Sequence, residues 1–422
     1  MAQYIQRKTY LEKLINRRDN GEIKIITGPR RTGKSWLLKR IYRDYLLQEG
    51  IKEDHIITVS FDIDESVDGK ELTDPLTLKQ HLYSKINTND SENYYVFLDE
   101  IQMVEGFERI VNGLNSYDNI DVYITGSNSK FLSSDINTIF RGRGDEVRVY
   151  PLSFKEFSEN RTETFTDLWQ EYYTYGGLPA LRNHKTKEQK IEYLNRLWQK
   201  TYIDDVVERN GVKNRYALEC IADVLCSSIG SLTNPTKISN TLKTVQKTDI
   251  SVDTVNTYLS HLYDAFLFIP AMRYDIKGKK YFNSIKKYYS IDLGLRNARL
   301  NFRQQEITHI MENVIFNELK IRGYQVDVGV IESRKFSGGV STYRQLEVDF
   351  IATDGVEKFY IQSAFALPDE DKKEQEIASL KKIDDSFRKI IIVGYDIATY
   401  IDENGFIFMS LRQFLNNTKI VE

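Results

Sequence analysis

The sequence has few of the residues that build disulfide frameworks and metal sites. Its 422 residues include only 2 cysteines, Cys220 and Cys226, and 5 scattered histidines. Neither set has the number or spacing of a disulfide framework or a zinc site. We therefore expect a reducing, cytoplasmic environment, and we expect both cysteines to lie on one helix.

Long apolar runs and a strong net charge are also missing. No segment is apolar enough over sufficient length to cross a bilayer, and the first residues, MAQYIQRKTYLEKL, are charged, unlike a secretory signal. With 58 Lys and Arg against 61 Asp and Glu, the net charge is only −3. No global positive field therefore draws the molecule to nucleic acid or anionic lipid. Nucleic-acid binding would depend on local patches, and no membrane partner is expected.

Apolar strand patterns and amphipathic helix patterns alternate over the first 150 residues. The expected strands are apolar on both faces, which indicates a parallel sheet covered by helices on both sides. Such a sheet predicts an α/β fold. The expected strands lie within residues 22–28, 55–64, 93–102 and 120–129.

The segment GPRRTGKS, residues 28–35, follows the first expected strand and precedes a helix pattern. It matches G-x-x-x-x-G-K-[ST], the phosphate loop of P-loop NTPases. Glycines let backbone N–H groups turn toward phosphate oxygens, and the start of the next helix favours their negative charge. We expect Lys34 to reach the β- and γ-phosphates of ATP and the Ser35 hydroxyl to ligate Mg²⁺. The residues expected to contact the nucleotide here are Gly28, Pro29, Arg30, Arg31, Thr32, Gly33, Lys34, Ser35 and Trp36.

The strand VFLDE, residues 96–100, ends in two carboxylates. We expect Asp99 to join the Mg²⁺ shell and Glu100 to orient or deprotonate a water that attacks the γ-phosphate. A kinase of small metabolites could share the loop, but the Asp-Glu pair favours hydrolysis because it supplies a base for water. The sequence thus predicts an ATPase in which Lys34, Asp99 and Glu100 are catalytic.

Two further segments offer less specific candidates. In YITGSNS, Ser127 or Asn128 is either a polar sensor of the γ-phosphate or part of an ordinary turn after a strand. In IFRGRG, Arg141 and Arg143 are candidates for stabilising transition-state charge on a neighbouring subunit, in a homo-oligomer. The alternative for both arginines is a surface turn with solvated charges.

Together these motifs resemble a known family. The segments GPRRTGKS, FLDEIQ, TGSNS, FRGRG, YPLSFKEF and GGLPAL are similar to those of AAA+-type ATPases of archaea and bacteria. The resemblance extends over nearly the whole chain to the branch fused to a winged helix and a C-terminal PD-(D/E)xK nuclease-like domain. It implies four parts: an AAA+ P-loop ATPase core with an αβα sheet (1–150), a helical lid (151–205), a winged helix-turn-helix (206–300) and a restriction-endonuclease-like α/β domain (301–422).

The resemblance also implies two outlying nucleotide contacts. Arg7, in YIQRKTYL, is similar to an N-terminal arginine near the adenine pocket. GGLP, residues 176–179, is similar to a lid motif near the base and phosphates. A helix-surface charge and a turn are the respective alternatives.

Residues 234–287 read as two helices, a turn and a basic hairpin. The second helix is expected to leave Asn256, Thr257 and Ser260 outward, where they suit phosphates or base edges. The alternative is a module that only packs between domains or mediates assembly. The residues expected to be buried on that helix are Val255, Tyr258, Leu259, Leu262 and Phe266. The lysines expected to pair with phosphates are Lys277, Lys279, Lys280, Lys286 and Lys287.

Nucleases of the resembled C-terminal fold need an acidic helix residue, an Asp on one strand and (D/E/Q)-x-K on the next. Glu312, Asp349 and Gln362 fill the first three positions, and Glu347 lies on the same strand face as Asp349. Ala364 stands at the lysine position and offers no amine. We therefore expect a vestigial nuclease site that is inactive or very weak. Lysines that could reach in from the helix beyond are Lys372, Lys373, Lys381 and Lys382.

The sequence as a whole predicts a Mg²⁺-dependent, ATP-hydrolysing protein. One expected function is action on DNA or RNA through the winged-helix and nuclease-like parts. The alternative is a nucleotide-controlled oligomeric switch that binds a protein partner, with an inactive C-terminal domain.

Overall fold

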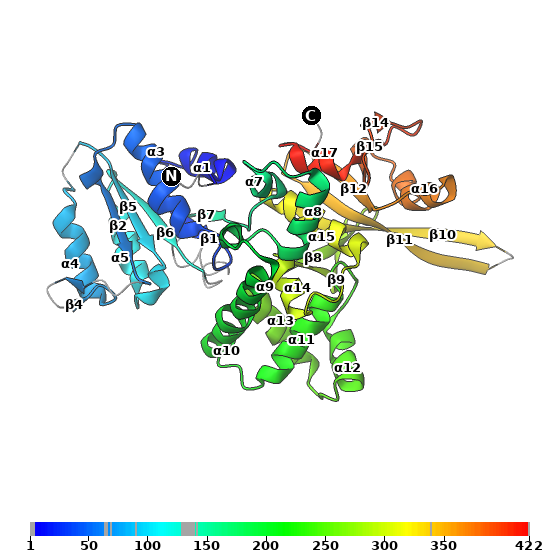
Figure 1. Cartoon of the computed structure of the whole chain (residues 1–422), viewed down its shortest axis with the longest axis horizontal. Helices are drawn as coiled ribbons and strands as arrows, with labels where there is room; N and C mark the ends of the chain where they lie inside the picture. Colours follow the sequence, from blue (N-terminus) through cyan, green and yellow to red (C-terminus); the bar gives the residue numbers. More distant parts are fainter. Residues whose placement is uncertain are drawn as a thin grey trace. The chain divides into compact units, whose positions relative to one another are not determined.

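The computed structural model divides the chain into two compact units. The first comprises Met1–Pro151 and Asp264–Phe266, and the second Leu152–Tyr263 and Leu267–Glu422 (Figure 1). No helix in the described part of the chain combines the length and the apolarity needed to cross a membrane. The structure describes residues 5–62, 66–67, 70–88, 91–127, 140, 142–337 and 340–420.

A five-stranded parallel sheet forms the centre of the first unit, in the order β2-β5-β6-β1-β7. Because β6 lies between β1 and β5, the carboxyl ends of these three strands are neighbours at one edge of the sheet. The strands are β1 (Ile23–Thr27), β2 (Ile56–Ser60), β5 (Tyr94–Asp99), β6 (Ile120–Thr125) and β7 (Gly144–Arg148), with a separate pair, β3 (Ser66–Val67) and β4 (Lys70–Glu71).

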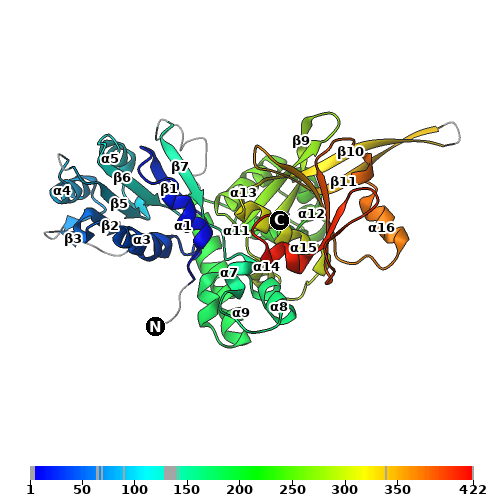
Figure 2. The ribbon, with the colours of Figure 1, turned by 90° about the horizontal axis from the view of Figure 1, so that it is seen from above.

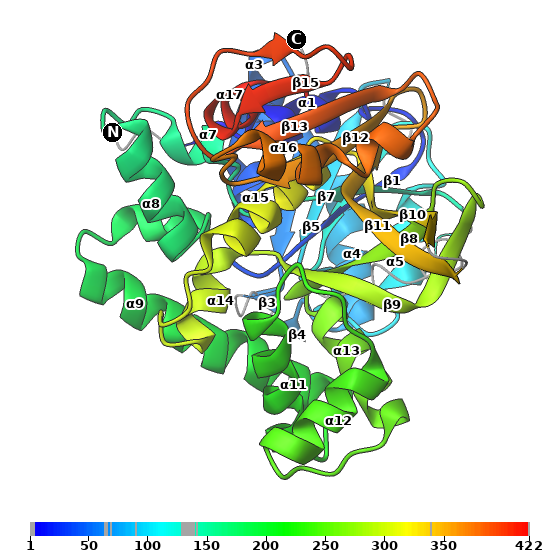
Figure 3. The ribbon, with the colours of Figure 1, turned by 90° about the vertical axis from the view of Figure 1, so that its right-hand side faces the viewer.

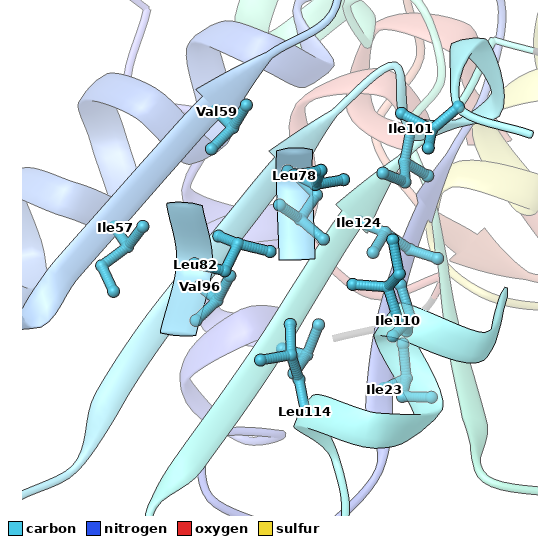
Figure 4. Close-up of a cluster of buried hydrophobic side chains, with 14 of the residues drawn as sticks. Ile23, Ile57, Val59, Leu78, Leu82, Val96, Ile101, Ile110, Leu114 and Ile124 are labelled. Carbon is cyan, nitrogen blue, oxygen red and sulfur yellow. The ribbon is translucent and has the colours of Figure 1, made fainter. Parts of the chain in front are cut away.

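Helices cover both faces of this sheet, as the doubly apolar strands predict. Along β5, Val96 and Leu98 join one apolar cluster and Tyr95 and Phe97 the other. Figure 4 shows the cluster in which α4 and α5 pack on the sheet. The helices are α1 (Lys8–Ile15), α2 (Lys34–Trp36), α3 (Arg43–Gln48), α4 (Pro75–Lys85) and α5 (Phe107–Leu114), with a π-helical stretch Leu37–Tyr42 between α2 and α3 and 3₁₀ turns at Glu53–His55 and Ile101–Met103.

Helices and an eight-stranded sheet make up the second unit. Both cysteines lie buried on α11, which confirms their expected place on one helix. Figure 3 shows α11, α12 and α13 as one group. The helices are α7 (Phe154–Ser158), α8 (Phe165–Tyr175), α9 (Lys187–Arg196), α10 (Asp204–Asn210), α11 (Arg215–Ser227), α12 (Pro235–Val245), α13 (Val252–Asp264), α14 (Leu293–Arg299), α15 (Ile307–Ile321), α16 (Glu370–Ile377) and α17 (Leu411–Asn416), with a π-helical stretch Leu197–Ile203 and 3₁₀ turns at Pro179–Asn183 and Leu380–Lys382.

The sheet of the second unit has the order β14-β15-β13-β12-β11-β10-β8-β9. The hairpin expected as the wing, β8–β9, therefore belongs to the same sheet as the C-terminal strands, because β8 pairs in parallel with β10. The hairpin β10–β11 forms a long arm (Figures 1 and 2). The strands are β8 (Phe268–Asp275), β9 (Lys280–Ser290), β10 (Gln325–Ser337), β11 (Val340–Thr353), β12 (Lys358–Ala364), β13 (Arg388–Val393), β14 (Tyr400–Ile401) and β15 (Ile407–Ser410).

The GGLP segment packs against the start of α14 in this second unit. The Asp292 carboxylate accepts the backbone N–H groups of Leu295 at 3.0 Å and Gly177 at 2.8 Å. Gly176 has φ +80°, and a Cβ there would lie 2.2 Å from Asp292 Oδ1, so only glycine fits. The nucleotide contact that the resemblance implies for this segment stays a prediction.

Candidate nucleotide site and acidic centre

The loop 28–35 connects β1 to the helix that begins at Lys34. Gly28 has φ +137°, and a Cβ there would lie 2.1 Å from the carbonyl oxygen of Val149, which follows β7. Gly33 has φ +91°, and the Thr32 hydroxyl donates to the Pro29 carbonyl at 2.9 Å. The loop is thus wrapped closely against the end of the sheet, with glycine where no side chain fits.

Gly28→Ala is expected to destabilise the first unit by about 2–4 kcal/mol, because the new Cβ combines a backbone clash with a strained φ. Gly50→Ala is the matched control, since Gly50 has φ +87° but nothing within 4 Å of its Cβ position. The control should lose only about 1 kcal/mol. Thermal or urea unfolding measures both, and equal losses would contradict the close approach at Gly28.

The Lys34 side chain is buried at the base of the loop. Its ammonium donates to the carbonyl oxygens of Gly28 at 3.0 Å and Pro29 at 2.9 Å. Burial lowers the pKa of Lys34 to about 8, although the nearby charges of Glu100 and Asp99 oppose this effect. The site therefore holds an ammonium close to its titration point, beside a loop that suits phosphate.

Nucleotide affinity is expected to fall above pH 8 for this reason. The free protein loses the Lys34 proton as the pH rises through about 8, whereas binding to phosphate requires the charged amine. Linkage predicts affinity that is nearly constant below pH 7 and about tenfold weaker at pH 9 than at pH 7. Titrations across this range test the effect. In Lys34→Arg the guanidinium stays charged, so a similar fall in that variant would assign it to another group.

Asp99, at the end of β5, contacts donor side chains from three elements. Its Oδ1 accepts the hydroxyls of Ser35 at 2.9 Å and Thr125 at 2.6 Å, and its Oδ2 lies 2.5 Å from Lys39 Nζ. The carboxylate is fully buried. Its position beside Ser35 brings together the two oxygen ligands expected for Mg²⁺.

Glu100, the next residue, has its own set of contacts. Its backbone is left-handed at φ 58°, ψ 42°, an uncommon conformation for a glutamate. Its N–H donates to Thr125 Oγ1 at 2.9 Å, and its Oε2 accepts Ser127 Oγ at 2.9 Å and the Gln102 amide. The two carboxylates are thus held by different partners and are available for different tasks.

The structure brings Arg7 to the same edge of the sheet. Its guanidinium donates to the Tyr150 carbonyl at 2.6 Å and lies 4.5 Å from the centre of the Tyr10 ring, while Tyr10 accepts the N–H of Tyr150 at 3.0 Å. Tyr150 follows Val149, the residue in contact with Gly28. A role of Arg7 at an adenine pocket stays a prediction.

Of the remaining described candidates, Trp36 directly follows Ser35 on α2, and Arg143 lies away from the loop. Arg143 is exposed just before β7, beside the start of β1, and so at the opposite end of the sheet from the loop. Trp36 is 49% exposed, with the Arg40 guanidinium 5.9 Å from its ring. Asn128 and Arg141 lie outside the described residues.

Sequence reasoning missed three partners in this site: Thr125, Gln102 and Lys39. Lys39 follows Ser35 by four residues on one helix, a spacing that places both on one face, and this could have been noticed. Thr125 depends on the insertion of β6 between β1 and β5, which the sequence does not reveal.

A second cluster of charges lies in the second unit and includes the expected acidic residues. Lys287 on β9 is buried with its Nζ 2.8 Å from Glu312 Oε1, 2.7 Å from Glu347 Oε1 and 3.7 Å from Asp349 Oδ1. The Tyr289 hydroxyl donates to Glu312 at 2.6 Å. Burial alone would lower the pKa of Lys287, but the carboxylates, Glu312 first, raise it above its usual value.

This cluster corrects two expectations about lysines. Lys287 does not join a solvent-facing basic run, because it is buried among carboxylates. The amine near the acidic residues comes from β9 and not from the segment after β12, where Lys372 pairs with Glu376, Lys373 with Glu370 and Lys381 with Glu374, and where Lys382 is exposed.

Comparison with known proteins places the first unit in a family of ATPases. Residues 20–158 match an AAA domain, and residues 166–306 match a domain of unknown function. The chain is similar to an uncharacterized protein of Haemophilus influenzae, at 38% identity over 94% of this chain and 96% of the relative. It is also similar to an uncharacterized protein of Methanocaldococcus jannaschii, at 28% identity over 90% of this chain and 83% of the relative.

Similarity to solved structures is weaker. The chain resembles the Aeropyrum pernix ORC1 protein in complex with DNA at 12% identity and a TM-score of 0.32, over 70% of this chain and 92% of that one. A likeness of this size carries no functional inference. The full-length match is decisive: the chain belongs to the same family as the Haemophilus influenzae protein, and its first unit is an AAA-type ATPase domain.

Proposed function

We propose that the chain binds ATP with Mg²⁺ at the loop 28–35 and hydrolyses it with Glu100 as the base. One observation carries this proposal. Ser35 and Asp99 are joined beside the loop, while Glu100 is held separately by Ser127 and Gln102. A metal ligand pair and a distinct base are what hydrolysis of a phosphoanhydride requires.

The residues present fit a nucleotide and a divalent cation. The loop has glycine where a side chain would collide with Val149, and the buried Lys34 ammonium donates to loop carbonyls that phosphate oxygens would replace. Ser35 and Asp99 would hold Mg²⁺ through oxygen atoms, the ligands it prefers. When bound, the metal would neutralise phosphate charge.

Each protein group then has a separate task. Lys34 binds and orients the phosphates. The Thr125 hydroxyl donates to Asp99 Oδ1 and accepts the backbone N–H of Glu100. These two hydrogen bonds keep both acidic residues in place. Glu100 orients a water and accepts its proton, and Ser127 fixes the carboxylate that does so. ATPase assays on the purified chain test this assignment.

We further propose that the second unit acts on nucleic acid through α13 and the turn before β9. Asn256, Thr257 and Ser260 are exposed on α13. The buried residues of this helix are Val255, Tyr258, Leu259 and Leu262. Lys277, Lys279 and Lys280 are exposed in and beside the turn. A polar helix face and neighbouring ammonium groups suit a phosphate backbone.

A matched pair of triple variants tests this proposal. Changing Lys277, Lys279 and Lys280 to Gln should weaken DNA or RNA binding and lower the slope of log K against log salt by about 2–3. Changing the exposed Lys185, Lys187 and Lys200 to Gln removes the same charge from elsewhere and should have little effect. Fluorescence anisotropy at several salt concentrations measures nucleic-acid affinity. ATPase rates measured with and without DNA and RNA show whether nucleic acid stimulates hydrolysis. Equal behaviour of both variants, or no binding at all, would exclude this surface.

The alternative is a switch in which nucleotide state controls assembly or capture of a protein partner. The acidic centre favours it, because Lys287 already engages the carboxylates that a nuclease would use. Sedimentation velocity without nucleotide, with ADP and with ATP distinguishes the two. An unchanged profile in all three states would contradict the assembly switch.

A further inference from the structure

The acidic centre of the second unit is built by four side chains from three elements. Lys287 comes from β9, Glu312 from α15, and Glu347 and Asp349 from one face of β11. Among the described residues that contact these carboxylates, Lys287 supplies the ammonium and reaches all three. The Nδ1 atom of His309 also lies 3.9 Å from Glu312 Oε2. The Lys287 amine, which is distant from the carboxylates in sequence, therefore provides their counter-charge.

Lys287 contacts all three carboxylates and so lies at the point where a divalent cation would have to bind. Its Nζ is 2.8 Å from Glu312 Oε1 and 2.7 Å from Glu347 Oε1. A divalent metal ion needs oxygen ligands at about 2.0–2.6 Å. It would therefore have to coordinate the same carboxylate oxygens that Lys287 contacts. The Lys287 ammonium and a divalent cation would repel each other strongly in the same buried site, because the local dielectric is low. In the first unit, by contrast, Lys39 contacts only Oδ2 of Asp99 and leaves Oδ1 beside Ser35.

The other ligands that the resembled nucleases use are also engaged. Asp349 Oδ2 accepts the N–H of Ser363 at 2.8 Å. Gln362 lies between the Asp349 N–H and the Glu376 carboxylate, both at 3.4 Å. Among the described residues, no group of three or more carboxylate, imidazole or thiol side chains is arranged to hold a metal ion. With Lys287 in place, the centre therefore does not fit a divalent metal.

The surroundings tie Lys287 into the core. Tyr289, two residues further along β9, donates to Glu312 at 2.6 Å and stacks on Phe316 with ring centres 4.1 Å apart. Lys287 and Tyr289 together connect β9 to α15 through Glu312. Lys287 also connects β9 to β11 through Glu347. Breaking these contacts would leave buried carboxylates without a counter-charge, which is costly.

We propose that Lys287 is the resident cation of this centre: it takes the place of a divalent metal, holds β9 against α15 and β11, and leaves the domain without metal-dependent phosphodiester cleavage. Removing the amine should convert the cluster into a divalent-cation site. The proposal is independent of ATP hydrolysis in the first unit.

Mn²⁺ titration of the nucleotide-free full chain, followed by EPR, tests the proposal. Lys287→Met should bind one more Mn²⁺ ion per chain than the wild type, at a site that the wild type lacks. Adding Asp349→Asn to that variant should remove the gained site. Lys286→Met, which removes the same charge from the adjacent residue, and Lys287→Arg, which keeps the charge, should gain none.

The outcomes separate cleanly. A wild-type chain that already binds Mn²⁺ at a site abolished by Asp349→Asn, or that cleaves DNA or RNA with Mn²⁺, overturns the proposal. So does a folded Lys287→Met variant that gains no site. If Lys287→Met does not fold, the double variant Lys287→Met with Glu312→Gln, which removes one charge of each sign, takes its place in the Mn²⁺ titration. A gained Mn²⁺ site is again the expected result, and no gained site again overturns the proposal.

Discussion

Lys34→Ala is expected to weaken ATP binding by about a hundredfold or more. The variant removes a buried ammonium that forms two hydrogen bonds at the base of the loop, 3.0 and 2.9 Å long, to groups that phosphate would replace. Two charge-assisted hydrogen bonds contribute about 1.5 kcal/mol each or more, which corresponds to a factor of about 10². Fluorescent-nucleotide titration or calorimetry with Mg²⁺ measures the loss, and turnover should fall below detection at ordinary ATP concentrations.

Lys85→Ala provides the control for this variant. Lys85 is exposed at the end of α4 in the same unit, so the substitution removes the same charge away from the loop. Its affinity for ATP should equal that of the wild type. If Lys34→Ala kept wild-type affinity while remaining folded, the loop would not be the phosphate site.

Glu100→Gln should leave ATP binding intact and slow hydrolysis by about 10²–10³-fold. The amide keeps the size of the side chain and an oxygen for Ser127, but it cannot take a proton from water. General-base catalysis typically contributes factors of this order. Single-turnover hydrolysis, measured beside equilibrium binding, separates the chemical step from affinity.

Glu105→Gln is the matched change for Glu100→Gln. Glu105 is exposed a few residues further along the chain, and the same substitution there should not alter the rate. Full activity in Glu100→Gln would assign the base to another residue. A parallel loss of binding would instead point to a structural role of the Ser127 and Gln102 contacts.

Local patterns predicted the first unit well. The alternation of apolar strands and helices, and the glycine spacing of the loop, depend on residues close together in sequence, and the structure confirms the parallel sheet with helices on both faces. Ser35 and Asp99 were expected to share one Mg²⁺ ion, and the structure places the Ser35 hydroxyl 2.9 Å from Asp99 Oδ1; their role as metal ligands stays a prediction. On α13, Val255 and Tyr258 are buried as predicted.

Contacts between distant segments could not be predicted in the same way. Thr125 meets Asp99 only because β6 is inserted beside β5, and strand order leaves no mark on a single sequence. Lys287 illustrates the difficulty more sharply. A lysine in a basic, aromatic stretch looks solvated, and only the pairing of β8 with β10 brings its hairpin into the C-terminal sheet beside Asp349.

Equilibrium binding of ATP to the wild-type chain, with and without Mg²⁺, tests the central claim most directly. The arrangement of Lys34, Ser35 and Asp99 predicts a single saturable site with a Kd below about 1 mM in the presence of the metal. It also predicts clearly weaker binding when the metal is removed with a chelator. No binding at millimolar ATP with Mg²⁺ would contradict the assignment of the loop and of every catalytic role built upon it.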